Sequence, residues 1–204
     1  MKKQSITTLF LDIGGVLLTN GWGRTSRALA ATQFNIDLVE MNERHHMCFD
    51  SYERGRITMD EYLKLVVFYE QRPFTIDAFK EFIYSQSQVL PGNIEFFKSL
   101  KQQYGLKVMA VNNEPREINE FRIKEFKLRE LFDAFVSSCH VGLRKPDGDI
   151  FRLAIDLAQT DPQQAIYIDD RKMFVEVAAQ TGLHAFQFSG IDSVKNQLEQ
   201  LLGD

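Results

Sequence analysis

The sequence predicts an α/β fold in which helices cover both faces of a doubly wound parallel sheet, with a helical bundle inserted after the first strand. Two observations lead to this class. Short, β-prone apolar runs alternate with amphipathic segments of helical spacing, and residues 20–87 have helical spacing without a convincing strand. Strands that alternate with helices form parallel sheets, because each crossover helix returns the chain to the end of the sheet at which the previous strand began.

The first strand is expected at residues 6–12, where a β-prone apolar run ends at Asp12 and two glycines follow. Four later runs have the same character, at residues 106–111, 134–137, 165–168 and 184–188. Helical spacing is marked by Ile94, Phe97 and Leu100, by Ile118, Phe121 and Phe126, and by Phe151, Ala154 and Leu157. We therefore expect five strands with helices packed between them.

The segment 20–87 is expected to form a small helical subdomain, or cap. Thr58 and Glu61 fit a capping box that opens one helix, and Pro73 with Thr75 marks the start of another. Because the sheet pattern resumes after this segment, its two ends are expected to lie close together. The predicted division is a core formed by residues 1–19 and 88–204, and a cap formed by residues 20–87.

The composition of the 204 residues limits the partners that we expect. The net charge is −4 and the basic residues are scattered, so nucleic acid is not an expected partner. Cys48 and Cys139 are too few for a disulfide framework, which suits a reducing compartment. Asp12 interrupts the apolar N-terminal run, and no other run reaches the roughly 18 apolar residues of a membrane span. We expect a cytoplasmic protein with no membrane contact, either a monomer or a weak homodimer.

Polar side chains follow three of the expected strands: Asp12, the pair Asn112 and Asn113, and the pair Asp169 and Asp170. In open α/β sheets, ligands bind outside the carboxyl ends of the strands. One Asp after a strand is unremarkable, because Asp favours loops, but three such positions together indicate a site. Converging carboxylates would repel one another unless a cation joined them, and Mg²⁺ prefers oxygen ligands of this kind.

Lys145 lies in a short basic turn before the helix expected at residues 147–158. Pro146 biases Lys145 toward an extended conformation and would be a natural first residue of that helix. A lysine held at the helix entrance could neutralise both Asp12 and a bound phosphate.

These motifs, in this order, resemble those of the haloacid-dehalogenase superfamily of hydrolases. The shared order is a hydrophobic strand ending in Asp, a strand ending in a small polar residue, Gly-X-X-Lys-Pro, and a strand ending in Asp-Asp. The segment 52–58, followed by Glu61 and Tyr62, also resembles the helical cap of the branch that includes bacterial sugar-phosphate phosphatases. The resemblance spans nearly the whole chain and implies a Rossmann-like core.

The resemblance also implies roles for individual residues. Asp12 would be the nucleophile that forms a covalent intermediate, and Lys145 would pair with it and with the transferred group. Mg²⁺ would be held by Asp12, by the carbonyl of Gly14 and by Asp170, with Asp169 as a shared or outer ligand. The residues expected to contact the substrate are Asn112, Asn113 and Arg24, with Arg27 close to the cap entry.

Three positions depart from the family pattern. Gly14 replaces the second Asp that protonates the leaving group, and the loss of a positioned acid/base typically costs about 10²- to 10⁴-fold in rate. Asn112 stands where a Ser or Thr hydroxyl usually bonds phosphate, and Phe174 stands where Asn or Asp is common. Several relatives in the same branch share the glycine at the position of Gly14.

Three functions remain open on the sequence alone. The first is a Mg²⁺-dependent phosphatase of a small phosphorylated metabolite, acting through an aspartyl-phosphate intermediate. The second is a metal-independent 2-haloacid dehalogenase, which also uses an Asp nucleophile and lacks the second Asp. The third is a catalytically impaired protein that binds phosphate or a metabolite without turnover.

Overall fold

The computed structural model describes residues 5–203 and contains a five-stranded sheet in the order β3-β2-β1-β4-β5, with every neighbouring pair parallel. The order reverses direction at β1, which is the doubly wound arrangement that the sequence predicts, and the α/β class is confirmed. The strands are β1 (Thr8–Leu11), β2 (Lys107–Asn112), β3 (Ala134–Ser137), β4 (Ala165–Asp169) and β5 (His184–Gln187).

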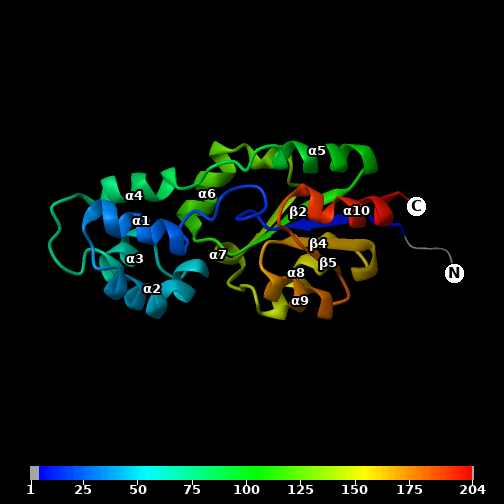
Figure 1. Cartoon of the computed structure of the whole chain (residues 1–204). Helices are drawn as coiled ribbons and strands as arrows, with labels where there is room; N and C mark the ends of the chain where they lie inside the picture. Colours follow the sequence, from blue (N-terminus) through cyan, green and yellow to red (C-terminus); the bar gives the residue numbers. More distant parts are fainter. Residues whose placement is uncertain (1–4, 204) are drawn as a thin grey trace.

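Helices cover both faces of the sheet, as Figure 1 shows. One layer contains α5 and α10, and the other contains α8 and α9. The bounds of the core helices are α5 (Asn93–Tyr104), α6 (Arg116–Glu125), α7 (Ser138–Val141), α8 (Gly148–Ala158), α9 (Lys172–Gln180) and α10 (Ile191–Leu202). Two short 3₁₀ turns lie at Leu128–Glu130 and Pro162–Gln164.

The central strand β1 is buried on both faces, which explains its unbroken apolar sequence. Because successive side chains of a strand point to opposite faces, Leu9 and Leu11 pack with the layer of α5 and α10, whereas Phe10 packs with the layer of α8 and α9. Leu11 pairs in register with Ala110 and Ile168. The carboxyl ends of β1, β2 and β4 are therefore level with one another.

Four helices between β1 and α5 pack at the end of the molecule away from the two termini (Figure 1). They are α1 (Arg24–Phe34), α2 (Leu38–Glu53), α3 (Met59–Val66) and α4 (Ile76–Ser85). The predicted capping box at the start of α3 is present, since Thr58 Oγ1 accepts from the Glu61 amide and the Glu61 carboxylate accepts from the Thr58 amide.

The chain enters and leaves this helical segment at one place. The Thr19 amide donates to the Gln88 carbonyl at 2.8 Å, and the Leu90 amide donates to the Leu17 carbonyl at 2.9 Å. We propose on this basis that the cap comprises residues 20–87. Residues 1–4 and 204 of the predicted core ranges lie outside the described residues.

The helical segment has its own apolar cluster, dominated by aromatic side chains. Phe79 is fully buried and lies at its centre, with ring centroids of five aromatic residues between 4.9 and 6.2 Å away.

No helix within residues 5–203 has the length and apolar character needed to cross a membrane.

We predict that Phe79→Ala lowers the free energy of unfolding by about 3–5 kcal/mol, because it leaves a cavity among these rings. Met47→Ala, at a position that is 84% exposed, is the control and should change it by less than about 0.5 kcal/mol. Urea unfolding followed by circular dichroism measures both. Equal stability of the two variants would contradict this view of the cluster.

Candidate active site

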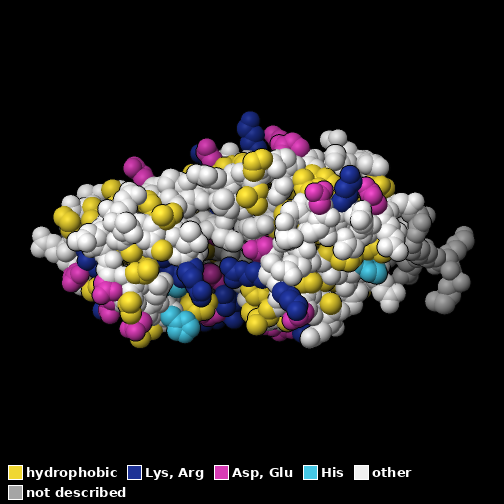
Figure 2. All heavy atoms as spheres, viewed as in Figure 1, with side chains coloured by type: hydrophobic (Ala, Val, Ile, Leu, Met, Phe, Trp, Pro, Cys, Tyr) yellow, Lys and Arg dark blue, Asp and Glu magenta, His cyan; other side chains and the backbone are white. Residues whose placement is uncertain are grey.

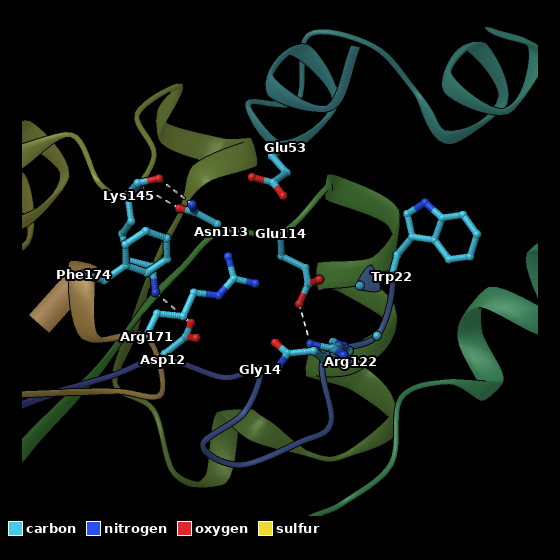
Figure 3. A pocket seen from close by; sticks show the side chains of 13 residues that line it. Asp12, Gly14, Trp22, Glu53, Asn113, Glu114, Arg122, Lys145, Arg171 and Phe174 are labelled. Carbon is cyan, nitrogen blue, oxygen red and sulfur yellow. Dashed lines mark hydrogen bonds and ion pairs between the residues drawn. The ribbon is translucent and has the colours of Figure 1, made fainter. Parts of the chain in front are cut away.

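The level carboxyl ends of β1, β2 and β4 open into a pocket of about 60 Å³. Asp12 follows β1, Asn113 follows β2, and Lys145 and Arg171 come from the turns before α8 and after β4. Figure 3 shows these side chains converging, with Gly14 at the base of the pocket. Of the strand-end residues that the sequence predicts as a site, Asp12 and Asn113 line this pocket, and Asp169 and Asp170 lie close to Asp12.

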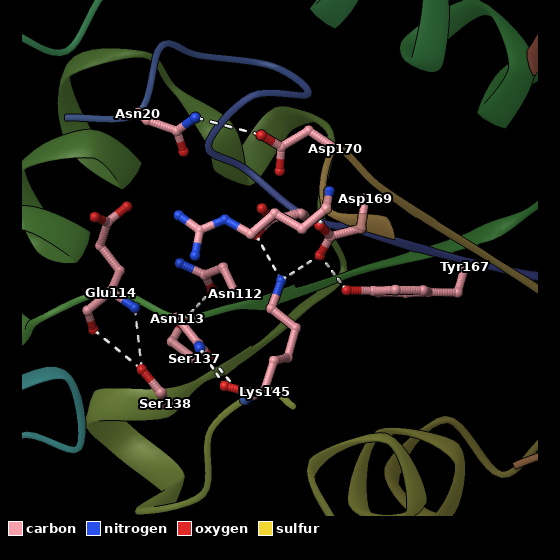
Figure 4. A network of polar contacts seen from close by, with 12 residues as sticks. Asn20, Asn112, Asn113, Glu114, Ser137, Ser138, Lys145, Tyr167, Asp169 and Asp170 are labelled. Atoms are coloured by element: carbon pink, nitrogen blue, oxygen red, sulfur yellow. Dashed lines mark hydrogen bonds and ion pairs between the residues drawn. The ribbon is translucent and has the colours of Figure 1, made fainter. Parts of the chain in front are cut away.

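Lys145 is the central charge of this pocket and is only 1% exposed. Its Nζ lies 3.0 Å from Asp12 Oδ1 and 2.6 Å from Asp169 Oδ2. Figure 3 draws the contact with Asp12, and Figure 4 draws the contact with Asp169. Burial alone would lower the pKa of Lys145, but the two carboxylates outweigh it and the pKa is raised. The lysine therefore remains an ammonium ion bridging the nucleophile candidate and the acid of β4.

Two neighbours hold Lys145 in place. The Asn113 side chain donates to the Lys145 carbonyl at 2.8 Å and accepts from the Lys145 amide at 2.9 Å. The ring of Phe174 lies under the ammonium group, with Nζ 5.1 Å from the centroid, which is a cation–π contact. Asn113 and Phe174 thus both position the lysine, although the sequence suggested Asn113 as a substrate contact and Phe174 only as a departure from the family pattern.

The turn at Lys145 differs from the prediction in one respect. Pro146 was expected to be the first helical residue, but α8 begins at Gly148, and Asp147 is its N-cap, accepting from the Asp149 amide at 3.0 Å. Pro146 therefore lies in the turn before α8, and the Lys145–Pro146 peptide bond is cis.

The structure does not place the Asn112 side chain in the pocket, contrary to the expectation that it contacts phosphate. Its Nδ2 donates to Asn119 Oδ1 at 3.0 Å, and its Oδ1 accepts from Ser137 Oγ at 2.8 Å. The reason is the two-residue period of β2, which puts Asn112 on the same face as Val108 and Ala110, toward α6. Asn112 is 1% exposed, and its amide group links the end of β2 to Ser137 on β3 and to Asn119 on α6.

The carboxyl groups of the site are in different protonation environments. Burial raises the pKa of Asp12 to about 7, against the opposing effect of Lys145 and with a further rise from Asp169. Burial would also raise the pKa of Asp169, but Lys145 and Tyr167 outweigh it, so the pKa lies below its ordinary value. Burial and Asp169 raise the pKa of Asp170.

Asp12, Asp169 and Asp170 each offer an oxygen, and these oxygens lie within 4.8 Å of one another. Both oxygens of Asp169 have protein partners, through Lys145, Tyr167 and the Arg171 amide. By contrast, Asp170 Oδ1 is buried with no hydrogen-bond partner among residues 5–203. An unpartnered buried carboxylate oxygen beside two further acids fits a hard cation such as Mg²⁺.

The loop after Asp12 packs closely at residues 14 and 15. A Cβ on Gly14 would lie 2.8 Å from Asn20 Oδ1, and Asn20 Nδ2 in turn lies 3.4 Å from Asp170 Oδ2. Gly15 has φ of +76°, and a Cβ there would collide with the Asp170 carboxyl group. Gly15 therefore allows the loop to pass directly beside Asp170, the residue that follows β4.

The pocket also contains charged residues that the sequence did not identify. Arg122 is 1% exposed, pairs with Glu114 Oε2 at 2.5 Å, and donates to Ser87 Oγ and to the Thr19 carbonyl. Glu53 reaches the pocket from the end of α2, and Figure 3 shows it above the core residues.

Weak signals for these residues were present in the sequence. Glu114 follows the strand-end pair of asparagines, Arg171 follows Asp170, and Glu53 lies in the cap segment 52–58. Arg24 does not line this pocket but lines a larger cavity next to it.

Residues 6–182 match the family model of haloacid dehalogenase-like hydrolases, so the chain belongs to this family. It is 25% identical over 201 residues to flavin mononucleotide hydrolase 1, a chloroplastic protein of Arabidopsis thaliana, with 98% of this chain and 79% of that protein covered. Several other curated relatives are longer, and the chain spans between 7% and 47% of their length.

Solved structures share the fold at low sequence identity. The HAD family enzyme bt-2542 of Bacteroides thetaiotaomicron superposes with a TM-score of 0.79 at 20% identity, covering 95% of this chain and 99% of that one. The L-2-haloacid dehalogenase RSc1362 superposes with a TM-score of 0.67 at 19% identity, covering 91% and 87%. These two likenesses show that the fold is shared.

We predict a pH-dependent stability that originates at Asp12. Its pKa is about 7 in the folded protein without metal, against an ordinary value of 3.8, so the folded state binds more protons than the unfolded state between these values. The free energy of unfolding of the wild type should therefore fall as pH rises through this window, relative to that of Asp12→Asn. Urea unfolding in EDTA at about pH 5 and about pH 7.5 measures the difference.

The comparison with Asp12→Asn is needed because His45 acts in the opposite direction. Burial, followed by Arg27 and His46, lowers the pKa of His45 to about 3, so its contribution to stability rises with pH. That contribution is common to both proteins and cancels in the difference. Parallel pH profiles for the two proteins would contradict the raised pKa of Asp12.

Proposed function

We propose that the protein is a Mg²⁺-dependent phosphatase that acts on a small phosphorylated metabolite, with Asp12 as nucleophile. The observation that carries this proposal is the buried, unpartnered Asp170 Oδ1 beside Asp12 and Asp169. Three acids outnumber the single ammonium group of Lys145, so without a further cation the site would repel a phosphate monoester, which is anionic. An acid cluster of this kind suits phosphoryl transfer better than attack on a haloacid.

The proposed reaction has two steps at Asp12. A carboxylate oxygen of Asp12 attacks phosphorus as the bond from phosphorus to the leaving oxygen breaks, which gives an aspartyl phosphate. Water then attacks phosphorus, and phosphate leaves as the Asp12 carboxylate is regenerated. Lys145 Nζ, 3.0 Å from Asp12 Oδ1, stabilises the negative charge on the transferred group.

Residues in the pocket and directly beside it could hold the proposed ion. Asp12, Asp170 and the Gly14 carbonyl would be the protein ligands, with Asp169 behind them as a shared or outer ligand. Bound Mg²⁺ would neutralise charge on the phosphate and lower the repulsion between substrate and nucleophile.

The leaving group needs a proton that Gly14 cannot supply. Besides Asp12, the acids lining the pocket within residues 5–203 are Glu53 and Glu114. Burial raises the pKa of both, against the opposing effects of Arg144 on Glu53 and of Arg122 on Glu114. These two side chains are the carboxyl groups available for proton transfer on the side of the pocket that faces the cap.

A metal-independent 2-haloacid dehalogenase is the second candidate, and Gly14 is the observation that favours it. Such an enzyme needs an Asp nucleophile but no second Asp, and L-2-haloacid dehalogenase RSc1362 shares the fold. A phosphate-binding protein without turnover is the third candidate, and Gly14 is again the observation that favours it. Activity toward 2-chloropropionate in EDTA would favour the second, and ligand-induced stabilisation without phosphate release would favour the third.

We predict that wild type releases inorganic phosphate from at least one member of a panel of sugar phosphates, nucleotides, FMN and acyl phosphates in the presence of Mg²⁺. Asp12→Asn should lower kcat by about 10³-fold or more, because an amide cannot act as the nucleophile. Asp149→Asn, on the exposed side of α8, is the matched control and should retain activity. Equal phosphate release by wild type and Asp12→Asn would exclude Asp12 as the nucleophile.

We also predict that Mg²⁺ raises the melting temperature of the wild type, and raises it more at about pH 7.5 than at about pH 5.5, since the ligands must be deprotonated. Asp170→Asn should weaken the apparent Mg²⁺ affinity by about 10-fold or more, because it neutralises a direct ligand. Asp149→Asn again serves as the control. An unchanged Mg²⁺ effect in Asp170→Asn would remove this residue from the proposed ligand set.

A further inference from the structure

A second, larger cavity adjoins the pocket and has a volume of about 1050 Å³, against about 60 Å³ for the pocket itself. It lies between the entry to the cap, helices α1 and α2, and the loop after β4. The two cavities share the lining residues Asn20, Trp22, Gly23, Glu53 and Arg171. A substrate whose phosphate lies at Asp12 would therefore extend its remaining atoms into the larger cavity.

The charge of the larger cavity is strongly positive. Four arginines line it, namely Arg24, Arg27, Arg144 and Arg171, and Glu53 is the acid in its lining among the described residues. Glu53 is already paired, since its Oε2 accepts from Arg144 at 2.6 Å. Figure 2 shows basic side chains gathered at the junction between the helical segment and the sheet domain.

Arg27 is the most informative of these residues because its charge is buried without a counterion. It is 9% exposed, and its Nε donates to Asn42 Oδ1 at 2.8 Å while Nη1 contacts the Trp22 carbonyl at 3.5 Å. No carboxylate lies within 4.0 Å of its guanidinium among residues 5–203. Burying a charge with only neutral partners is unfavourable, and the two contacts hold the side chain in one orientation.

Two further arginines in the same lining also have no acidic partner among the described residues. Arg24 precedes Arg27 by three positions on α1, where like charges destabilise a helix. Arg171 approaches from the core side, lines both cavities, and lies over the ring of Phe174 at 5.4 Å. Three cations from opposite walls of one cavity thus share a space in which Glu53, already paired with Arg144, is the acid in the lining among the described residues.

We propose that this cavity binds a second anionic group of the substrate, remote from the phosphate that is cleaved at Asp12. The substrate class is then a small organic phosphate that carries a further phosphate or a carboxylate. Trp22, Phe49 and Leu29 provide apolar surface for the carbon skeleton between the two anions. The proposal rests on the proposed phosphatase function and specifies the part of the substrate that the cap recognises.

The test compares substrates that differ in one anionic group. Fructose 1,6-bisphosphate is compared with fructose 6-phosphate, and 6-phosphogluconate with glucose 6-phosphate, with FMN as a large substrate that carries a single phosphate. We expect KM to be about 10-fold or more lower for the doubly anionic member of at least one pair. One charge-assisted hydrogen bond from an arginine to the second anion would be enough for a change of about this size. The pair that responds shows whether the second group is a phosphate or a carboxylate.

Variants then assign the effect to the cavity. Arg27→Gln and, separately, Arg24→Gln should raise KM for the doubly anionic substrate about 10-fold or more and should change KM for its singly anionic partner less than about twofold. Arg24 is exposed, so that variant is expected to fold even if the buried Arg27→Gln does not, and Arg27→Lys should recover part of the affinity. Arg152→Gln, at an exposed arginine on α8, is the matched control.

Two outcomes would overturn the proposal: equal KM values within both pairs, or an equal rise for both members of the responding pair in Arg24→Gln. A failure of the phosphatase proposal is distinguished by calorimetry with Asp12→Asn, which measures binding without turnover. Asp12→Asn should bind fructose 1,6-bisphosphate more tightly than fructose 6-phosphate, and the double variant Asp12→Asn/Arg24→Gln should lose this difference. That result would support binding of a second anionic group in the cavity even if wild type hydrolysed neither compound. Equal binding of both compounds would overturn it.

Discussion

The ammonium group of Lys145 is the interaction on which the arrangement of the site depends. It is buried at the carboxyl ends of the central strands and contacts Asp12, which follows β1, and Asp169, the last residue of β4. A buried ammonium is stable only with close negative partners, and the two carboxylates are tolerated side by side only because the ammonium is there. Asn113 fixes the lysine backbone, so strands β1, β2 and β4 are all joined through one residue.

The same arrangement separates two tasks. The core pocket concentrates negative charge around one lysine and fits a metal ion and a phosphate, whereas the cavity beneath the cap is lined by cations. Under the proposed function, this difference in charge would orient an elongated anionic ligand that binds together with a metal ion. Arg171 belongs to both linings and therefore lies where the two cavities meet.

The sheet and the convergence of its strand ends could be predicted from the sequence, because buried parallel strands are short, apolar and end at polar residues. The direction of individual side chains at those ends could not. The two-residue period of β2 turns the Asn112 side chain away from the pocket, where it bonds to Asn119 on α6 and Ser137 on β3. Neither of these two residues forms a sequence motif with Asn112. The unpaired state of Arg27 likewise depends on which acids the fold brings near, which spacing along the chain does not reveal.

The base of the cap has a mechanical property that follows from Arg122. Its guanidinium donates to the Thr19 carbonyl and to Ser87 Oγ, one on each of the two chain connections to the cap, and its third contact is Glu114 in the pocket. A rigid rotation of the cap about these connections would have to break bonds to a buried guanidinium or carry α6 with it. The hinge and the pocket wall are therefore one mechanical unit, in which displacement of the cap is transmitted to the carboxyl group of Glu114.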